Sequence, residues 1–194
     1  MGSAPDGAVT AGPGRREQLL AAAREVLATN GYERTTVSSI AMKASVAQGT
    51  FYLYFPSKEA LPGAIAEQLC TAMGEAATLA ARAGDFDSAL EALVRESFTT
   101  AAEFGDVLLI ANRGIELSED WPAWLQVTAP WREGIERFLL RFQRSGDVAS
   151  ALDVPTTTLL VRDLLDRAAK ARVLYDQSSY AEATVKLLRR ALAS

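Results

Sequence analysis

The spacing of apolar residues is the feature that most constrains the fold of this chain. After Gly14, apolar side chains recur three and four residues apart almost to the C-terminus, and no stretch alternates for long between apolar and polar residues. Three-and-four spacing places side chains on one face of an α-helix, whereas alternation is typical of a strand. Because 49% of the residues are hydrophobic, the chain also has enough apolar surface to form a core. The sequence therefore predicts an all-α protein.

Glycine, proline and helix-capping residues divide this pattern into about nine helices. Asn30-Gly31 closes the first of them, since glycine tolerates the left-handed geometry of a helix C-terminus. Residues 1–14 lack periodicity and are rich in small residues, so we expect a disordered tail there. The expected helices cover approximately residues 15–30, 36–43, 47–54, 57–83, 88–103, 106–117, 124–144, 156–175 and 180–193.

The composition argues against several function classes. The chain contains no histidine, so it has no imidazole metal ligand and no catalytic triad that depends on histidine. Cys70, the single cysteine, lies in an apolar stretch, which favours a buried structural thiol over a reactive one. We therefore expect no enzyme activity, catalytic residue, metal or cofactor. No apolar run approaches the roughly 20 residues of a membrane span, and no signal peptide is evident, so we expect a cytoplasmic protein without a membrane partner.

The charge is distributed unevenly along the chain. The formal net charge is -4, yet the segment from Arg15 to Glu59 holds six basic and four acidic residues. The N-terminal part is therefore mildly basic and the remainder is acidic. A basic segment suits a partner with phosphate groups, although a surplus of two charges is weak support taken alone.

The segment Thr36–Phe55 has the organisation of a helix-turn-helix. Two short helices that cross steeply need a small residue at their closest approach, and Ala41 provides one. They also need inward-facing apolar residues at helical spacing. The residues with that spacing are Ile40, Val46, Phe51 and Phe55. Short polar side chains at the start of the second helix complete a motif that enters the major groove of DNA.

This segment closely resembles the TetR family of transcriptional regulators. The resemblance extends from Arg15 to about Leu61, and its most specific part is the string GTFYLYFPSKEAL from Gly49 to Leu61. One departure is Ser45, which stands at the turn position that glycine usually takes in helix-turn-helix proteins. If that residue has a positive φ, serine costs about 1 kcal/mol relative to glycine.

The resemblance implies two domains with different functions. Residues 15–61 would form a helix-turn-helix DNA-binding domain with three helices. Residues 62–194 would form a larger helical domain for effector binding and dimerisation. The helix expected after Ser57 would connect the two, so a shift of that helix could change DNA binding. The function implied is that of a repressor released from a palindromic operator in double-stranded DNA by an apolar or aromatic small molecule.

Three residues at the start of the expected recognition helix are candidates for base readout. Gln48 can pair with an adenine edge, and the methyl group of Thr50 can contact a thymine methyl. Gly49 would allow the backbone to approach DNA closely. The alternative is that Gln48 and Thr50 are only exposed residues at a helix start, and that Gly49 only makes that start flexible.

Five residues are candidates for phosphate contacts, which position a protein without specifying a sequence. The resemblance assigns Tyr52 and Tyr54 to phosphates through their hydroxyl groups, while packing of the rings in the core is the alternative. Lys58 stands at a helix start, where its charge and the free N–H groups suit a phosphate. Thr36 offers a hydroxyl at another helix start, and Lys43 is the weaker candidate.

The C-terminal part contains many large apolar residues at helical spacing, and the resemblance implies a ligand cavity among them. Such cavities are mostly apolar with a few polar groups. The alternative is an ordinary core, which is the better interpretation for most of these residues. The candidate ligand-binding residues are Met73, Phe98, Leu108, Asn112, Glu116, Trp124 and Trp131.

The last two expected helices carry apolar stripes. One stripe includes Leu160 and Leu164, and the other includes Leu187 and Leu188. In proteins of the TetR type, this pair of helices packs against its copy to form a homodimer, whereas the alternative is burial inside one subunit. A different class of function is a helical adaptor that has lost DNA binding, although the intact string from Gln48 to Lys58 argues against it.

Overall fold

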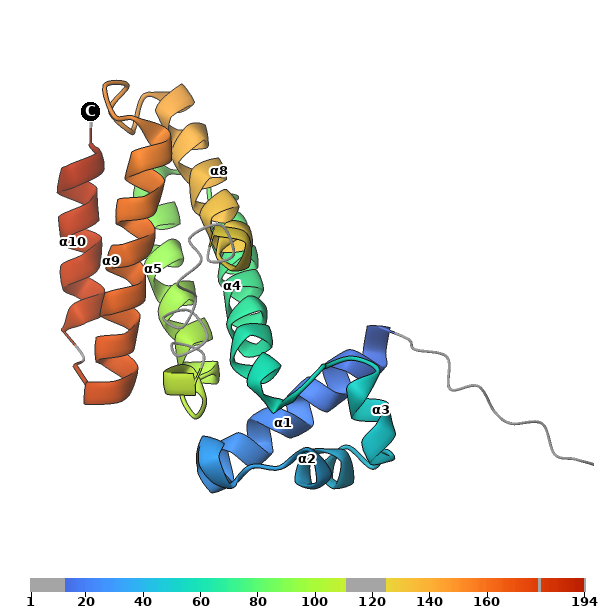
Figure 1. Ribbon diagram of the computed structural model, residues 1–194. Coiled ribbons are helices and arrows are strands. Elements are labelled where there is room, and N and C mark those ends of the chain that lie inside the picture. Colours follow the sequence, from blue (N-terminus) through green and yellow to red (C-terminus); the bar gives the residue numbers. More distant parts are fainter. Residues whose placement is uncertain (1–12, 111–124, 178, 194) are drawn as a thin grey trace, which may run out of the picture. The chain divides into compact units, whose positions relative to one another are not determined.

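A computed structural model describes residues 13–110, 125–177 and 179–193 (Figure 1). The chain divides into two compact units, of which unit 1 ends at Leu61 and unit 2 begins at Pro62. The described residues form helices and their connections, with one isolated antiparallel bridge between Val148 and Ala193. The prediction of an all-α fold is confirmed.

The described part of unit 1, from Pro13, contains three α-helices and a short 3-10 helix. These are α1 (Pro13–Arg34), α2 (Val37–Lys43), α3 (Gln48–Tyr52) and η1 (Lys58–Ala60). Helix α2 packs against both α1 and α3. Apolar side chains from all three helices and from the segment after α3 are buried together. The largest of them are Leu19, Leu20, Leu27, Ile40, Phe51 and Phe55.

Helix α1 differs from its predicted bounds at both ends. It begins at Pro13, inside the segment predicted as a disordered tail, because proline is well suited to the first turn of a helix. The rest of that predicted tail, residues 1–12, lies outside the described residues. Gly31 has φ 74°, in the left-handed region that the sequence indicated, but a further helical turn follows it as far as Arg34.

Unit 2 is a bundle of long helices. Its described helices are α4 (Leu61–Ala80), α5 (Phe86–Glu103), α8 (Ala129–Ser145), α9 (Val154–Tyr175) and α10 (Tyr180–Leu192). Helix α9 packs against α5, α8 and α10, and α10 also packs against α5. The five helices lie side by side in Figure 1. The isolated bridge joins the α8–α9 connection to the C-terminal end of α10.

Aspartate caps set the starts of two helices in unit 2. Asp85 accepts a hydrogen bond from the backbone N–H of Ser88 at 2.9 Å, so α5 begins two residues before its predicted start. Asp153 accepts one from the N–H of Thr156 at 3.0 Å, and α9 begins at Val154, two residues before its predicted start at 156, so that Pro155 lies inside the helix. That prediction was wrong because proline is tolerated in the first turn of a helix.

Three other predicted helices differ from the described ones or lie partly outside the described residues. The helix predicted to reach 83 ends at Ala80 in α4, and its start is the 3-10 helix η1. The helix predicted over 106–117 lies largely outside the described residues, although residues 108–110 are helical. The start predicted at Trp124 for the next helix also lies outside them, and α8 begins at Ala129.

Helices α4 and α8 cross at two glycines. A Cβ atom added to Gly74 would lie 2.3 Å from the backbone oxygen of Pro130. A Cβ atom added to Gly134 would lie 2.5 Å from the backbone oxygen of Gly74. The two backbones are therefore too close for any side chain at the crossing. Elsewhere in unit 2, the rings of Phe86 on α5 and of Phe138 and Phe142 on α8 form a buried cluster with centroids 5.0 to 6.3 Å apart.

Candidate nucleic-acid interface

The first helix of the motif, α2, is fixed at its N-terminus by a reciprocal cap. The Thr36 hydroxyl accepts a hydrogen bond from the backbone N–H of Ser39 at 3.1 Å, and the Ser39 hydroxyl accepts one from the N–H of Thr36 at 3.2 Å. This arrangement satisfies two backbone donors that a helix start leaves open. Thr36 is itself exposed. Its position is therefore the one predicted for a phosphate contact, at the start of α2.

The turn between α2 and α3 is tight and tied to α1. Ala41 is 2% exposed, and its backbone oxygen accepts a hydrogen bond from Val46 N–H at 2.9 Å. Ser45 has φ 54°, so serine occupies the left-handed position where glycine is usual. The side-chain amide of Gln18 donates to the backbone oxygen of Ala44 at 2.9 Å. The motif is thus held rigidly despite the strained serine.

Helix α3 buries one side and exposes the other. Phe51 is fully buried, and its ring packs against that of Phe55 with centroids 5.3 Å apart. Gln48 and Gly49 are exposed at the start of the helix, and Thr50 is half-buried. The two phenylalanines therefore fix the orientation of α3, and the three candidate base-reading residues lie together in its first turn.

Gly49 is not required by the packing of unit 1. A Cβ atom placed on it would meet no atom within 4 Å, and its φ is not in the left-handed region. Alanine would be preferred over glycine in such a helix by about 1 kcal/mol. The absence of a side chain at this position therefore leaves space on the outer surface of α3, where a partner such as DNA would approach.

The two candidate lysines interact with groups of the protein itself. The ammonium group of Lys43 lies 2.6 Å from the carboxylate of Glu25. The ammonium group of Lys58 donates to the backbone oxygen of Tyr32 at 3.2 Å and lies 4.6 Å from the centre of the Tyr32 ring. Sequence reasoning did not foresee either partner. Because the Lys43 pair is exposed, it is worth little and leaves that lysine able to turn toward a phosphate.

The two tyrosines of the motif differ in their surroundings. Tyr52 is 52% exposed, as a phosphate contact requires. The hydroxyl oxygen of Tyr54 is buried and has no hydrogen-bond partner within the described parts of the chain. A buried oxygen does not reach a phosphate without a rotation of the side chain. The structure therefore favours core packing for Tyr54, the alternative that the sequence left open.

Sequence reasoning missed two apolar residues on the surface of the motif. Met42 in α2 is 77% exposed, and Leu53 directly after α3 is 62% exposed. The signal was available, because both residues stand between inward-facing positions in the helical pattern. Together with Tyr52 they give the outer surface of the motif an apolar component that suits contacts with thymine methyl groups or sugars.

Four of the predicted ligand-binding residues are described, and all four are buried. These are Met73 (2% exposed), Phe98 (8%), Leu108 (1%) and Trp131 (3%). The indole N–H of Trp131 has no hydrogen-bond partner in the described segments, which is unusual for a buried donor. The other three predicted residues, Asn112, Glu116 and Trp124, lie outside the described residues.

The predicted dimer stripes leave an apolar groove open on unit 2. A groove of about 340 Å³ runs between α9 and α10 and is lined mainly by leucines. Leu160 on α9 is 65% exposed and Leu187 on α10 is 54% exposed, while Leu188 is buried. Part of each stripe thus serves the core of the subunit, and the remainder is exposed to solvent.

The cysteine, metal-binding and membrane-spanning features of the chain also bear on its function. Burial raises the pKa of the Cys70 thiol to about 12, so the group stays protonated, as expected for a structural cysteine. Among the described residues, no cluster of acidic and cysteine side chains could hold a metal ion. In the same part of the chain, no helix has the length and apolarity needed to cross a membrane.

Comparison with known proteins gives matches to both units. Residues 19–65 match the model for bacterial regulatory proteins of the tetR family, and residues 90–192 match the tetracyclin repressor-like C-terminal domain. An uncharacterised HTH-type transcriptional regulator of Bacillus subtilis (strain 168), YvdT, is 29% identical over 158 residues, which cover 81% of each chain.

Two solved structures share the fold. The fatty acid degradation regulator FadR from Bacillus halodurans has a TM-score of 0.70 and 25% identity, covering 93% of this chain and 95% of its own. FadR from Bacillus subtilis, solved in complex with stearoyl-CoA, has a TM-score of 0.72 and 23% identity, covering 92% of this chain and 97% of its own. The helix-turn-helix, the helical body and the match of both units together show that this chain belongs to the TetR family of bacterial transcriptional regulators.

Proposed function

We propose that this regulator is a repressor that binds a palindromic operator as a homodimer and leaves it when a small molecule binds unit 2. The observation that carries the proposal is the outer surface of α3. There Gln48 and Gly49 are exposed, and Gly49 has open space that the protein's own packing does not explain. The protein would act in the cytoplasm, where the operator DNA lies.

On DNA, Gln48 and Thr50 would read base edges while Gly49 lets the backbone of α3 approach. Tyr52 and Thr36 are exposed and would bond phosphates. Lys43 would join them by exchanging its exposed partner Glu25 for a phosphate. Because α3 carries no arginine, the commonest contact to guanine is absent, and DNA shape would contribute to recognition.

Two copies of the chain would pair through the α9–α10 groove. Exposed Leu160 and Leu187 would be covered by the same residues of a second copy, as a two-fold interface requires. Such a pair would place two recognition helices about 34–36 Å apart, one turn of the double helix, if it binds as helix-turn-helix dimers do, and this spacing would account for a palindromic site. The proposal thus links the apolar surface of unit 2 to the DNA surface of unit 1.

The effector would act by favouring a conformer with a different position of α4. That helix begins at Leu61, the last residue of unit 1, and continues through unit 2. An effector shifts this equilibrium only as far as its affinities for the two conformers differ. The stearoyl-CoA bound by FadR from Bacillus subtilis supports an effector with a large apolar part. Met73 on α4 and Trp131 on α8 are buried and would be repacked by the shift of α4.

The first test is selection of random duplex DNA by the purified protein, followed by a salt titration with the selected sequence. We expect an enriched inverted repeat whose affinity falls steeply with salt, because phosphate contacts release counterions. The variant Gln48→Ala should relax sequence preference at one base position of each half-site. It should also weaken the free energy of binding to the selected sequence by about 1–3 kcal/mol. Gln177→Ala, also exposed but in unit 2, is the matched control. If no sequence is enriched, the helical adaptor becomes the better interpretation.

The second test concerns the dimer. Leu160→Glu with Leu187→Glu places charges in the groove, so sedimentation should show a monomer where the parent protein is a dimer. Leu79→Glu is the matched control, because Leu79 is 59% exposed on α4 and lies outside the groove. A dimer that survives the double substitution would move the interface elsewhere and remove the basis for the proposed half-site spacing.

A further inference from the structure

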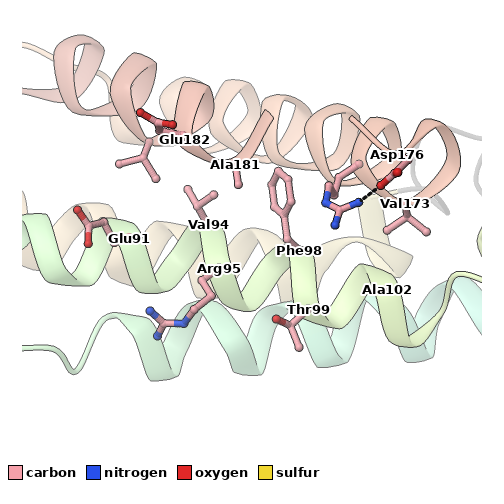
Figure 2. A pocket seen from close by; sticks show the side chains of 12 residues that line it. Glu91, Val94, Arg95, Phe98, Thr99, Ala102, Val173, Asp176, Ala181 and Glu182 are labelled. Atoms are coloured by element: carbon pink, nitrogen blue, oxygen red, sulfur yellow. Dashed lines mark hydrogen bonds and ion pairs between the residues drawn. The ribbon is translucent and has the colours of Figure 1, made fainter. Parts of the chain in front are cut away.

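A cleft separates α10 from α5 in unit 2. It is lined by α5, α9 and α10 and has a volume of about 810 Å³ (Figure 2). This volume is in the range of small-molecule binding sites, whose volumes are roughly 300–1,000 Å³. Of the four predicted ligand residues that the structure describes, Phe98 is the one that lines it, at one wall. The cleft is distinct from the leucine groove between α9 and α10, with which it shares no lining residue.

The inner surface of the cleft is apolar. In Figure 2 the side chains of Val94 and Phe98 on α5 point toward Ala181 on α10 across the opening. None of these side chains is polar, so burial of an apolar ligand surface would supply the affinity. Besides these three, the apolar lining residues are Ala102, Val173 and Val185.

The rim of the cleft is charged. Two basic and three acidic side chains line it, and each is already engaged in an ion pair. The pairs are Arg95–Glu96, Arg172–Asp176, Glu91–Arg189 and Glu182–Lys186. Because these charges are already paired, a charged ligand would have to displace an existing partner, whereas an uncharged ligand with a hydrogen-bonding group would find both donors and acceptors.

The cleft and the proposed dimer groove lie on different faces of α10. Ala181, Val185 and Arg189 recur every four residues and share the face that looks toward α5. Leu187 and Ala191 share another face and line the groove. Arg189 also ties α10 to α5, because its guanidinium donates to Asp87 at 2.6 Å and to Glu91 at 3.2 Å. A ligand between α5 and α10 would therefore change the position of a helix that the dimer uses.

We propose that this cleft is the effector site and that it accepts an uncharged amphipathic molecule. Its apolar part lies against Phe98 and Val94, and its hydrogen-bonding group lies at the rim near Arg172 and Asp176. Binding moves α10 away from α5, which changes the geometry of the dimer and, through the helical bundle, favours the displaced position of α4 proposed above. This inference rests on the proposed function, to which it adds the place of the site and the class of the effector.

The binding test uses N-phenyl-1-naphthylamine, an uncharged amphipathic dye whose fluorescence rises in apolar surroundings. Ala181→Trp should fill the cleft and weaken dye binding at least tenfold, while Ala151→Trp, an exposed residue in the α8–α9 connection, should bind like the parent protein. Val173→Phe fills the cleft from α9 and gives an independent variant if Ala181→Trp fails to fold. The proposal is overturned if the parent does not bind the dye or if both folded filling variants bind it unchanged.

The second arm measures operator affinity with and without the dye. We expect saturating dye to weaken operator binding of the parent protein at least fivefold and to leave a filling variant unaffected. Dye binding in the cleft without this effect would overturn the effector role. Failure of the parent to bind any selected DNA is a different result, because it overturns the proposed function. The dye titration needs no DNA, so the two failures are distinguishable.

Discussion

The two units of this protein use glycine for opposite reasons. In unit 1, Gly49 lies on the exposed surface of α3, and a Cβ atom there would meet nothing within 4 Å. In unit 2, Gly74 and Gly134 lie at the crossing of α4 and α8, where a Cβ atom would lie 2.3 to 2.5 Å from a backbone oxygen. The comparison teaches that a glycine needed by the fold has its reason within the chain. Gly49 has no such reason within the chain, and its place in the first turn of the recognition helix makes contact with DNA the reason that we propose.

The largest effect should follow from Gly134→Ala. The added methyl group would lie 2.5 Å from the backbone oxygen of Gly74, and backbone atoms of two packed helices move only at high cost. Overpacking of this kind lowers the free energy of unfolding by about 1–3 kcal/mol, and we expect the upper end. Unfolding in urea, followed by circular dichroism, would show a lower midpoint with an unchanged slope.

The control for that variant is Gly63→Ala. Gly63 also lies in a helix of unit 2, but a Cβ atom on it would meet nothing within 4 Å. Because alanine is the better helix former, this change should stabilise the protein slightly. Equal effects of the two substitutions would show that α4 and α8 separate easily and that the crossing does not constrain them.

Gly49→Ala should produce the second largest effect, on DNA rather than on folding. We expect operator affinity to fall roughly tenfold, or about 1.4 kcal/mol, because the methyl group would occupy the space through which α3 approaches the bases. The free energy of unfolding should meanwhile rise, since alanine favours the helix. Titration of labelled operator measures the first quantity and urea unfolding the second. Gly63→Ala again serves as control, and an undiminished operator affinity of Gly49→Ala would separate Gly49 from the interface.

The difference between the two units also explains which structural features could be predicted from the sequence. In unit 1 the deciding contacts are local: Thr36 caps α2 through Ser39, and Phe51 packs on Phe55 four residues later. Patterns of three and four residues reveal such contacts. The bond from Lys58 to the backbone of Tyr32 spans 26 residues, and nothing in the pattern near Lys58 indicates it.

Unit 2 shows more clearly which structural features could not be predicted from the sequence. Most ends of its described helices were predicted within three residues, because periodicity and caps are local properties. The crossing of Gly74 with Gly134 and the cleft between α5 and α10 both depend on which helices become neighbours. Val94 and Ala181 look like ordinary core residues in the sequence. Only the packing of α10 against α5 turns them into the two sides of a cleft.

Backbone strain offers a third contrast between the units. Ser45 in unit 1 and Asp176 in unit 2 both have a positive φ, at 54° and 50°. Ser45→Gly should raise the free energy of unfolding by about 1 kcal/mol, because glycine adopts this conformation without strain. Asp176→Gly should gain less, since aspartate tolerates the left-handed region better and the change removes its ion pair with Arg172. Urea midpoints of the two variants measure the difference, and a larger gain for Asp176→Gly would contradict it.

The smallest effect concerns helix caps and pH. In unit 1, α2 is capped by the hydroxyl groups of Thr36 and Ser39, which do not titrate near neutral pH. In unit 2, hydrogen bonds from Ser88 hold the pKa of Asp85 below its usual range, and those from Thr156 do the same for Asp153. A lowered pKa in the folded state stabilises the protein above the ordinary aspartate pKa of about 3.9. That contribution disappears as the pH falls through the lower, folded value.

The double variant D85N/D153N isolates this contribution, because asparagine caps a helix about as well as aspartate but carries no titrating group. At pH 7 the parent and the variant should have similar stability. As the pH falls from 5 to below the ordinary aspartate pKa, about 3.9, the parent should lose stability relative to the variant, since only the parent takes up protons at these caps on unfolding. Thermal melts of both proteins across this interval provide the comparison. If the difference in melting temperature stays constant with pH, the caps of unit 2 stabilise the protein independently of pH, as the hydroxyl caps of unit 1 do.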